Sequence, residues 1–397
     1  MTRLRGSTWN HTRGYAPLVA TAKSYQLTHP EVEIHWDKRS LQEFADFPVE
    51  TLAETYDLVM IDHPSVGTCE LQRCFVPLDE ILPTRTLETL ARQSVGCSHP
   101  SYSYNGHHWA LAIDAASHVS VYRLDLLNRS NLTIPRSWEQ VVKLAQGLHR
   151  TGETLMAVPL IPVDSLMCFY TLCASAGEDP FSADDQRVVS RKTGLRVLDL
   201  MGQVLTLLHP ECLNWNPIQI LDRMSSTDEL AYCPWIFGYS NYAKPGYASF
   251  QCHFTNIPTL NGGLSKGAIL GGAGLAVTSK CANPSVAADY ASFVASAECQ
   301  RSSYFESGGQ PGNIEAWRDP AVNRASNDFF LNTLETLTHS YVRPRYPGYI
   351  HFQTQAGLLL HKYLKIGGHG GQLLEELDHL HRVTRNSIHS SKGNQRE

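Results

Sequence analysis

The sequence predicts an α/β protein built of two domains, and three observations support this prediction. The chain has 397 residues, which is enough for two domains at roughly 150 residues each. Strand and helix patterns alternate through the first 63 residues. The segment YDLVMI at residues 56–61 is continuously apolar, as is typical of strands buried on both faces of a parallel sheet.

The N-terminal elements place polar residues directly after predicted strands. A strand is predicted at residues 3–9, a polar turn at 10–14, a helix at 17–27 that carries Pro17 in its first turn, and a strand at 31–36. In open α/β sheets, ligands bind beyond the carboxyl ends of the strands. The first candidates for a binding site are therefore Asn10, His11, Arg39, Asp62 and His63.

The middle of the chain reads differently. Residues 107–113 and 118–123 predict two strands joined through Asp114-Ala-Ala, and Ser137 is expected to cap a helix at 138–149. Three more strands and six more helices are predicted further along the chain. The strands lie at 156–161, 230–235 and 268–278, and the helices at 163–176, 191–208, 284–305, 327–338, 352–365 and 372–385.

Composition and charge exclude several classes of protein. Apolar residues make up 42% of the chain and charged residues 18%, as in an ordinary globular protein. The net charge of −5, with basic residues scattered except for Arg343 and Arg345, argues against a nucleic-acid partner. No run of about 18 apolar residues exists to span a bilayer. The ten cysteines lie mostly in apolar segments, which predicts buried thiols and fits a reducing compartment best.

The sequence motifs predict neither a cofactor nor a metal. Residues 263–267 match G-x-S-x-G, but an Asn-Gly-Gly turn stands where a nucleophile elbow needs a strand. The glycines at 271–274 lack the spacing of a dinucleotide fingerprint, and no P-loop or H-E-x-x-H motif occurs. The glycines instead suggest a close backbone approach, either to a ligand or at a bend.

An aromatic loop is more informative. Trp235, Phe237, Tyr239, Tyr242 and Tyr247 stand among small and polar residues without helical spacing. Such a loop either packs on a core or lines a ligand site, and the sequence leaves both open, as it does for Trp9. Sugar rings stack on aromatic side chains, and their hydroxyl groups need polar side chains such as those predicted at the strand ends.

These motifs together resemble the extracellular solute-binding proteins of ABC transporters, in the large group that captures sugars. The resemblance is carried by HPEVEIHWD, YDLVMIDHP, YSYNGHHWALAIDAASHVSVYR, IPRSWEQVVKLAQ, AILGGAGLAVTSKCANPSVAADYASFVASAECQ and SGGQPGNIEAW, in that order along nearly the whole chain. It implies a type II periplasmic-binding fold. In that fold, two α/β domains exchange crossing hinge segments around an interdomain cleft. The expected lobes are 1–113 plus 269–312 and 114–268 plus 313–397.

The resemblance also implies a function and a set of ligand-binding residues. The chain would bind a neutral sugar or a sugar acid, without catalysis, and as a monomer deliver it to a membrane permease pair. Ligand contacts would come from Trp9, Asn10, Arg39, Asp62, His63, Asp114, Trp235, Phe237, Tyr239, Tyr242, Gly271, Gly272 and Gln310. The family implies a periplasmic or extracellular location. Residues 1–14 do not read as a secretory signal, so a native start at Met1 implies a cytoplasmic protein. The alternatives are an intracellular enzyme, with Asp62 and His63 as an acid/base pair, or a ligand sensor.

Overall fold

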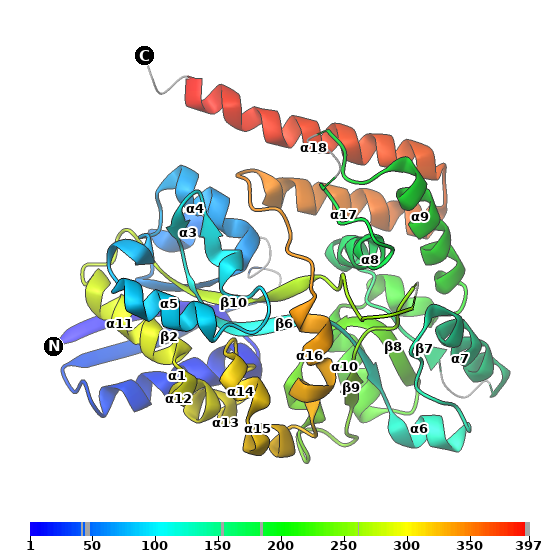
Figure 1. Ribbon diagram of the computed structural model, residues 1–397, viewed down its shortest axis with the longest axis horizontal. Helices are drawn as coiled ribbons and strands as arrows, with labels where there is room; N and C mark the ends of the chain where they lie inside the picture. The colour runs from blue at the N-terminus through cyan, green and yellow to red at the C-terminus, as the bar shows by residue number, and fades with distance from the viewer. Residues whose placement is uncertain (41–42, 44–47, 152–154, 183–185, 261, 394–397) are drawn as a thin grey trace. The chain divides into compact units, whose positions relative to one another are not determined.

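The computed structural model describes residues 1–397 except 41–42, 44–47, 152–154, 183–185, 261 and 394–397 (Figure 1). The chain forms two compact units. Unit 1 comprises Met1–Ala116, Leu270–Arg324 and Val342–Ile350, and unit 2 comprises Ser117–Ile269, Ala325–Tyr341 and His351–Glu397. The predicted α/β class is confirmed in both units, because each combines strands with helices.

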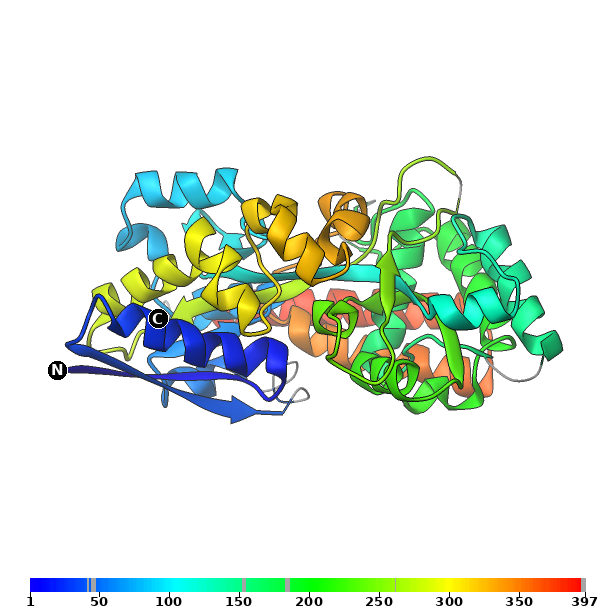
Figure 2. The same ribbon diagram turned by 90° about the horizontal axis from the view of Figure 1, so that it is seen from below.

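The sheet of unit 1 has the strand order β2-β1-β3-β10, with β6 next to β10. β1 pairs in parallel with β2 and β3, whereas β10 is antiparallel to β3. Figure 2 shows β1 and β2 side by side with α1 against them. The strands of unit 1 are β1 (Thr2–Trp9), β2 (Val32–Arg39), β3 (Leu58–Ile61), β4 (Ser103–Tyr104), β5 (His107–His108), the first part of β6 (Leu111–Tyr122) and β10 (Leu270–Val277).

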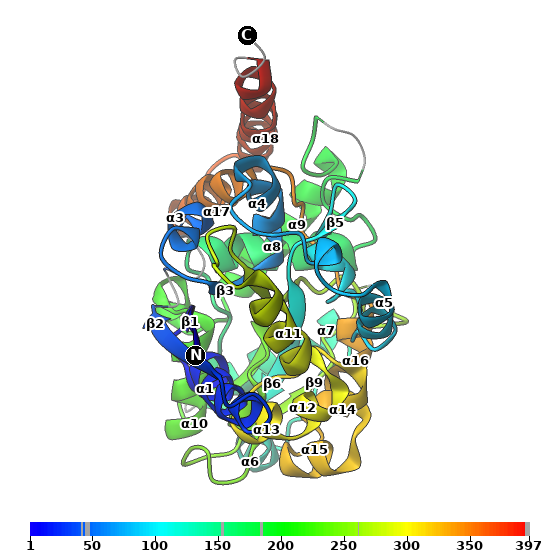
Figure 3. The same ribbon diagram turned by 90° about the vertical axis from the view of Figure 1, so that its left-hand side faces the viewer.

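Two hydrophobic clusters cover the two faces of this sheet. Leu58 and Met60 of β3 belong to the cluster that includes α1 and α11, whereas Val59 and Ile61 belong to the cluster that includes α3 and α4. The alternation explains why the sequence of β3 is continuously apolar. Figure 3 shows α3 and α4 on one side of the sheet and α1 on the other. The helices are α1 (Thr12–Gln26), α3 (Val49–Ala53), α4 (Val66–Gln72), α5 (Thr84–Arg92), α11 (Pro284–Ala295), α12 (Ala297–Arg301), α13 (Ser303–Glu306), α14 (Ile314–Arg318) and α15 (Pro320–Ala325).

Unit 2 is built on the second part of β6. In this unit β6 pairs antiparallel with β8 and β9, and β7 runs parallel to β8. The other strands are β7 (Leu155–Met156), β8 (Leu230–Phe237) and β9 (His253–Thr255). The helices are α6 (Leu124–Arg129), α7 (Trp138–Thr151), α8 (Pro162–Ser175), α9 (Arg191–Leu205), α10 (Pro217–Ser226), α16 (Phe329–Thr338), α17 (Tyr349–Ile366) and α18 (Gly370–Gly393).

Of the strand predicted at 156–161 only Met156 lies in β7, and three further predicted elements differ from the structure. The predicted turn at 10–14 is mostly helix, because His11 caps α1 and its Nδ1 accepts a hydrogen bond from the Arg13 backbone amide. The predicted helix at 284–305 is three helices, since Ser296 and Ser302 have non-helical backbone angles. The two strands predicted around Asp114 form one strand, β6, and the start of the 107–113 prediction belongs to the separate β4–β5 hairpin.

That hairpin follows from its turn residues. Asn105 and Gly106 join β4 to β5 with φ values of 50° and 86°. An Asn-Gly pair with positive φ at both positions is the favoured two-residue hairpin turn. The hairpin therefore ends at His108, and β6 begins at Leu111.

The observed units divide the chain differently from the predicted lobes after residue 312. The first two observed crossings, after Ala116 and Ile269, compare with predicted crossings after 113 and 268. Residues 313–324 and 342–350 belong to unit 1, although the sequence placed them in the second lobe. Hydrogen bonds hold the first of these segments, because Asn313 Nδ2 donates to the Ala295 carbonyl oxygen and the indole of Trp317 donates to that of Pro311.

The buried-thiol prediction is confirmed. All ten cysteines are free thiols, nine of them buried and Cys97 partly exposed. Among the described helices, none is both long enough and apolar enough to cross a membrane.

Candidate functional site

The parallel strands of unit 1 bring four of the predicted site residues to one edge of the sheet. β1, β2 and β3 run in the same direction, so Asn10, Arg39 and the Asp62-His63 pair follow strand ends at the same edge. The backbone amide of Asn10 donates to the backbone carbonyl oxygen of Arg39 over 2.7 Å, which holds the two strand ends together. Asn10 is exposed, whereas the Arg39 guanidinium is buried and donates to the Met60 carbonyl oxygen.

Trp9 faces the core of unit 1. Its side chain is 4% exposed and belongs to the same hydrophobic cluster as Leu18 of α1. A Cβ atom at Gly14 would lie 2.4 Å from the indole, so the ring rests directly on the glycine backbone of α1. This packing is the core alternative that the sequence left open, and a contact between Trp9 and ligand stays a prediction.

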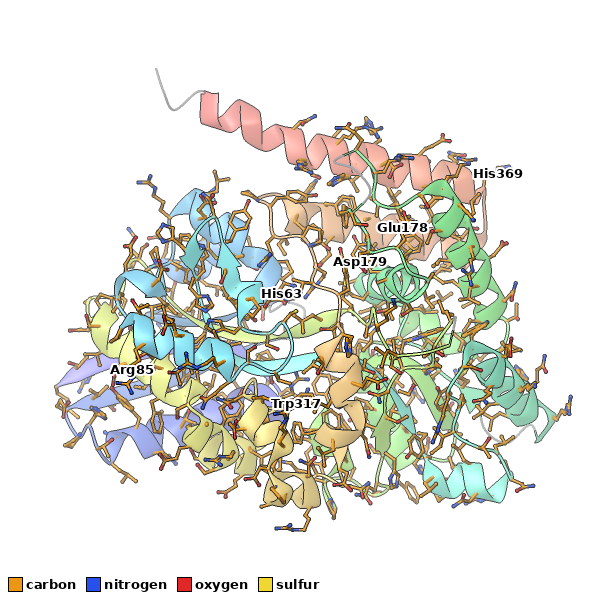
Figure 4. All side chains as sticks on the ribbon, in the orientation of Figure 1. His63, Arg85, Glu178, Asp179, Trp317 and His369 are labelled. Atoms are coloured by element: carbon orange, nitrogen blue, oxygen red, sulfur yellow. The ribbon has the colours of Figure 1, made fainter. Side chains whose placement is uncertain are left out.

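Asp62 lies in a charged cluster that the sequence did not predict in full. It caps the short helix η1 (His63–Ser65), and its Oδ1 accepts the His63 backbone amide at 2.9 Å. His63 Nδ1 lies 3.2 Å from the same oxygen, and Arg343 Nη2 lies 2.5 Å from Oδ2. The Asp62 side chain is 22% exposed, whereas those of His63 and Arg343 are 1% and 4% exposed. Figure 4 shows His63 directly after β3.

The electrostatics of this cluster set its protonation at neutral pH. Burial raises the pKa of Asp62, but the charge of Arg343 and the hydrogen bonds from His63 and Arg343 outweigh it and hold the pKa at about 2. Burial and the Arg343 charge lower the pKa of His63 to about 4, against the hydrogen bond to Asp62. At pH 7 the cluster therefore contains one carboxylate, one guanidinium and one neutral imidazole.

Asp114 and Gln310 have structural partners inside unit 1. Both Asp114 oxygens accept hydrogen bonds from Arg13, at 2.8 Å from Nε and 2.5 Å from Nη2. Gln310 is fully buried, and its Nε2 donates to the Ala115 carbonyl oxygen over 2.8 Å. Gly272 has a φ of +113°, and a Cβ atom there would lie 2.4 Å from the Asp114 carbonyl oxygen.

The close backbone approach at Gly272 is to β6, whereas the sequence predicted an approach to a ligand or at a bend. Gly271 beside it is partly exposed. A role of these glycines, Asp114 or Gln310 in ligand binding stays a prediction.

The aromatic residues of unit 2 divide into buried and partly exposed rings. Trp235 is 2% exposed and stacks on Trp138, with ring centroids 5.3 Å apart and an angle of 14° between the planes. Tyr239 and Tyr242 are also buried, and the Tyr242 hydroxyl donates to Asp222 Oδ1 over 2.6 Å. Phe237, the last residue of β8, is partly exposed. Of the four rings, Phe237 has the most surface with which to stack on a ligand.

His118 packs against the Phe237 ring, and the sequence did not predict this contact. The imidazole lies edge-on to the Phe237 ring at 4.6 Å between centroids. It is fully buried, and its Nδ1 lies 2.9 Å from Thr171 Oγ1 of α8. A histidine inside a strand gives no sign of its neighbours in sequence, because Thr171 and Phe237 come from other elements.

Arg343 and Arg13 are the other contributors that sequence reasoning missed. In the sequence, Arg343 and Arg345 stand out only because they are two basic residues close together. Arg13 lies 101 residues from Asp114 and Arg343 lies 281 residues from Asp62. The one signal in the sequence is the pair Pro344 and Pro347, which disfavours a helix in this part of the chain. An extended segment can reach distant residues such as Asp62.

The fold agrees with the comparison to known families. The chain belongs to the bacterial extracellular solute-binding protein family, whose sequence model matches residues 48–327. This match spans most of unit 1 and unit 2 and confirms the resemblance on which the sequence prediction rested. Among curated proteins, none matches the chain significantly.

Solved structures show the same fold at low sequence identity. The maltose-bound MalE3 of Thermotoga maritima is 16% identical, with 96% of this chain and 100% of that chain covered and a TM-score of 0.82. An ABC-transporter solute-binding protein of Agrobacterium radiobacter in complex with ribitol is 17% identical, with coverage of 97% and 98% and a TM-score of 0.80. The GacH receptor of Streptomyces glaucescens, solved with and without acarbose, is 15% identical, with coverage of 97% and 99% and a TM-score of 0.80. The predicted type II periplasmic-binding fold is thereby confirmed.

Proposed function

We propose that the protein binds a sugar or a related polyhydroxyl compound and delivers it to an ABC importer. Membership of the extracellular solute-binding family supports the binding role. Structures with this fold were solved with maltose, with ribitol and with acarbose, which are all rich in hydroxyl groups. The partners would be the membrane permease subunits of the importer. The protein would act as a monomer outside the cytoplasmic membrane.

The observation that carries the proposal is the partly exposed Asp62 carboxylate at the carboxyl edge of the unit 1 sheet. Each carboxylate oxygen can accept about two hydrogen bonds. The two His63 nitrogens occupy Oδ1, whereas Oδ2 receives only Arg343 among the contacts of this cluster. Oδ2 therefore keeps one position for a ligand hydroxyl, and exposed Asn10 on the neighbouring strand end can both donate and accept.

Unit 2 would contribute a stacking surface. Phe237 is partly exposed and its orientation is fixed by His118, so the ring is prepared to receive the apolar face of a sugar. A fixed ring loses little conformational entropy on binding, which favours affinity. The expectation that the ligand lies between the two lobes stays a prediction.

The alternative of an acid/base enzyme has less support from the geometry. A general base near neutral pH needs a pKa close to that pH and access to the substrate. Burial and the Arg343 charge hold the pKa of His63 at about 4, and its side chain is 1% exposed. Asp62 keeps a pKa of about 2 beside Arg343, so it would accept a proton poorly.

A thermal-shift screen followed by recovery of the ligand tests the proposed function. Maltose, ribitol, D-mannitol and D-tagatose are added separately, and a ligand at 100 times its dissociation constant should add about 2.7 kcal/mol of stability. Mass spectrometry of the recovered ligand should show it unchanged after long incubation. A new product that requires Asp62 would overturn the binding role in favour of the enzyme, and no shift with any hydroxyl compound would overturn sugar binding.

A further inference from the structure

We propose that Arg343 neutralises the Asp62 end of the ligand site and thereby selects uncharged sugars and polyols over amino sugars and sugar acids. The inference rests on the proposed function, because it requires that the ligand reach Asp62. It narrows the ligand class that the sequence left open between a neutral sugar and a carboxylate.

Arg343 is buried against Asp62. Its side chain is 4% exposed, and Nη2 lies 2.5 Å from Asp62 Oδ2. An arginine this deeply buried is rarely found without a carboxylate partner. Asp62 is the more exposed member of the pair, so a ligand would meet the carboxylate with the guanidinium directly behind it.

The segment that carries Arg343 is anchored to unit 1. Val342–Ile350, which we name the strap, belongs to unit 1 although the residues on either side of it belong to unit 2. Arg345 anchors it, because Nη1 donates to the carbonyl oxygens of Pro100, Ser101 and Ser103 over 2.9, 3.2 and 2.7 Å.

Gly67 of α4 lets the strap approach closely. A Cβ atom at Gly67 would lie 1.9 Å from the Arg345 carbonyl oxygen, so no other residue fits without moving the strap. The backbone that carries Arg343 is therefore held against α4 and the Pro100–Ser103 segment of unit 1.

His63 is neutral at pH 7, so the cluster of Asp62, His63 and Arg343 has no net charge. Arg345 donates to three carbonyl oxygens and keeps its charge at the strap, and the charge of Arg39 at the end of β2 is opposed by Glu43. The other buried carboxylate of unit 1, Asp114, is paired with Arg13.

The consequence concerns the net charge that a ligand can bring. A neutral hydroxyl needs only the acceptor position left on Asp62 Oδ2. An ammonium group would compete with Arg343 for the same carboxylate, and a ligand carboxylate would meet the negative charge of Asp62 first. At the Asp62–Arg343 pair both charges already face each other, so a charged ligand group would lose hydration there without gaining a countercharge of its own.

Two matched sets of probes test this inference by calorimetric titration of the full chain at about pH 6.5, where His63 is still neutral and amines are protonated. The ring set is D-glucose, D-glucosamine and D-glucuronate. The open-chain set is D-sorbitol, D-glucamine and D-gluconate. For the wild type, the tightest neutral probe should bind at least about tenfold more tightly than the tightest charged probe, which corresponds to about 1.4 kcal/mol.

Two substitutions should shift this preference in opposite directions. Arg343→Met leaves the Asp62 carboxylate without its partner, so the affinity for the amine relative to the neutral parent should rise at least about tenfold. Asp62→Asn removes the carboxylate that faces Arg343, so the affinity for the acid relative to the neutral parent should rise. Arg92→Met also removes one positive charge from unit 1, but from an exposed side chain, and should change neither ratio.

The outcomes separate the inference from the proposed function. If no probe and no hydroxyl compound of the wider panel binds the wild type, the proposed function is wrong. If a charged probe binds the wild type more tightly than its neutral parent, sugar binding stands and charge selection is overturned. Unchanged ratios in a folded Arg343→Met protein would also overturn it. If that variant does not fold, the Asp62→Asn ratio for the acids decides alone.

Discussion

Replacing Asp114 by Asn should destabilise the protein strongly, because the Asp114–Arg13 pair is closed off from water. The two side chains are 0% and 4% exposed and share two hydrogen bonds of 2.8 and 2.5 Å. Asn keeps the shape but removes the charge and turns one acceptor into a donor that faces the guanidinium. Breaking a buried pair by removing one partner costs about 3–5 kcal/mol, since the other charge stays buried.

For a cooperative unit of about 150–250 residues, the range in which unit 1 falls, about 2–4 °C of melting temperature is lost per kcal/mol. The expected decrease for Asp114→Asn is therefore about 6–20 °C by calorimetry, with a parallel shift in urea unfolding. The matched control is Glu33→Gln, which breaks an ion pair with Arg3 whose side chains are 52% and 80% exposed. Exposed pairs contribute about 0–1 kcal/mol, so this variant should melt within about 4 °C of the wild type.

A double-mutant cycle decides whether the pair is the cause. Arg13→Met combined with Asp114→Asn removes both charges, and replacing a buried ion pair by uncharged side chains is often neutral. The double variant should therefore be more stable than the sum of the two single losses predicts, by at least about 1 kcal/mol. Additive losses, or a wild-type melting temperature for Asp114→Asn, would refute the reasoning. At a temperature where the variant is folded, its ligand affinity should change little, because the Asp114 side chain is 0% exposed.

Two further predictions concern His63 and the aromatic residues of unit 2. The pKa of His63 is lowered from 6.5 to about 4, so its contribution to stability is present above pH 6.5 and is lost as the pH falls toward 4. The free energy of urea unfolding should fall over that window by up to about 3 kcal/mol more in the wild type than in His63→Gln, and equal pH profiles would contradict this. Phe237→Ala should weaken ligand binding by about 1–3 kcal/mol with little loss of stability, whereas Trp235→Ala should cost about 3–5 kcal/mol of stability. Phe250→Ala, an exposed ring in the same unit, is the control for affinity, and an equal loss of affinity in Phe237→Ala and Phe250→Ala would exclude stacking at Phe237.

The sequence alone determined which segments are strands and helices wherever a local pattern dominates. The apolar run at 56–61 contains β3, because its alternate residues are buried in two cores on opposite faces of the sheet. The Gly-rich segment at 268–278 contains β10, and the order of the motifs identified the family. The strand ends that carry Asn10, Arg39 and Asp62 followed from the same patterns, because parallel strands end at one edge.

The tertiary structure alone decided which charges are paired and therefore which candidates remain available to a ligand. The sequence predicted Asp114 in a connection between two strands, whereas in the structure it lies within the single strand β6 and pairs with Arg13, 101 positions away. Asp62 meets Arg343 across 281 positions through the strap, which no local pattern assigns to unit 1. Local periodicity reports the burial of neighbouring residues, whereas an ion pair depends on where the whole chain places two distant side chains, and for that reason sequence reasoning found one member of each pair and missed the other.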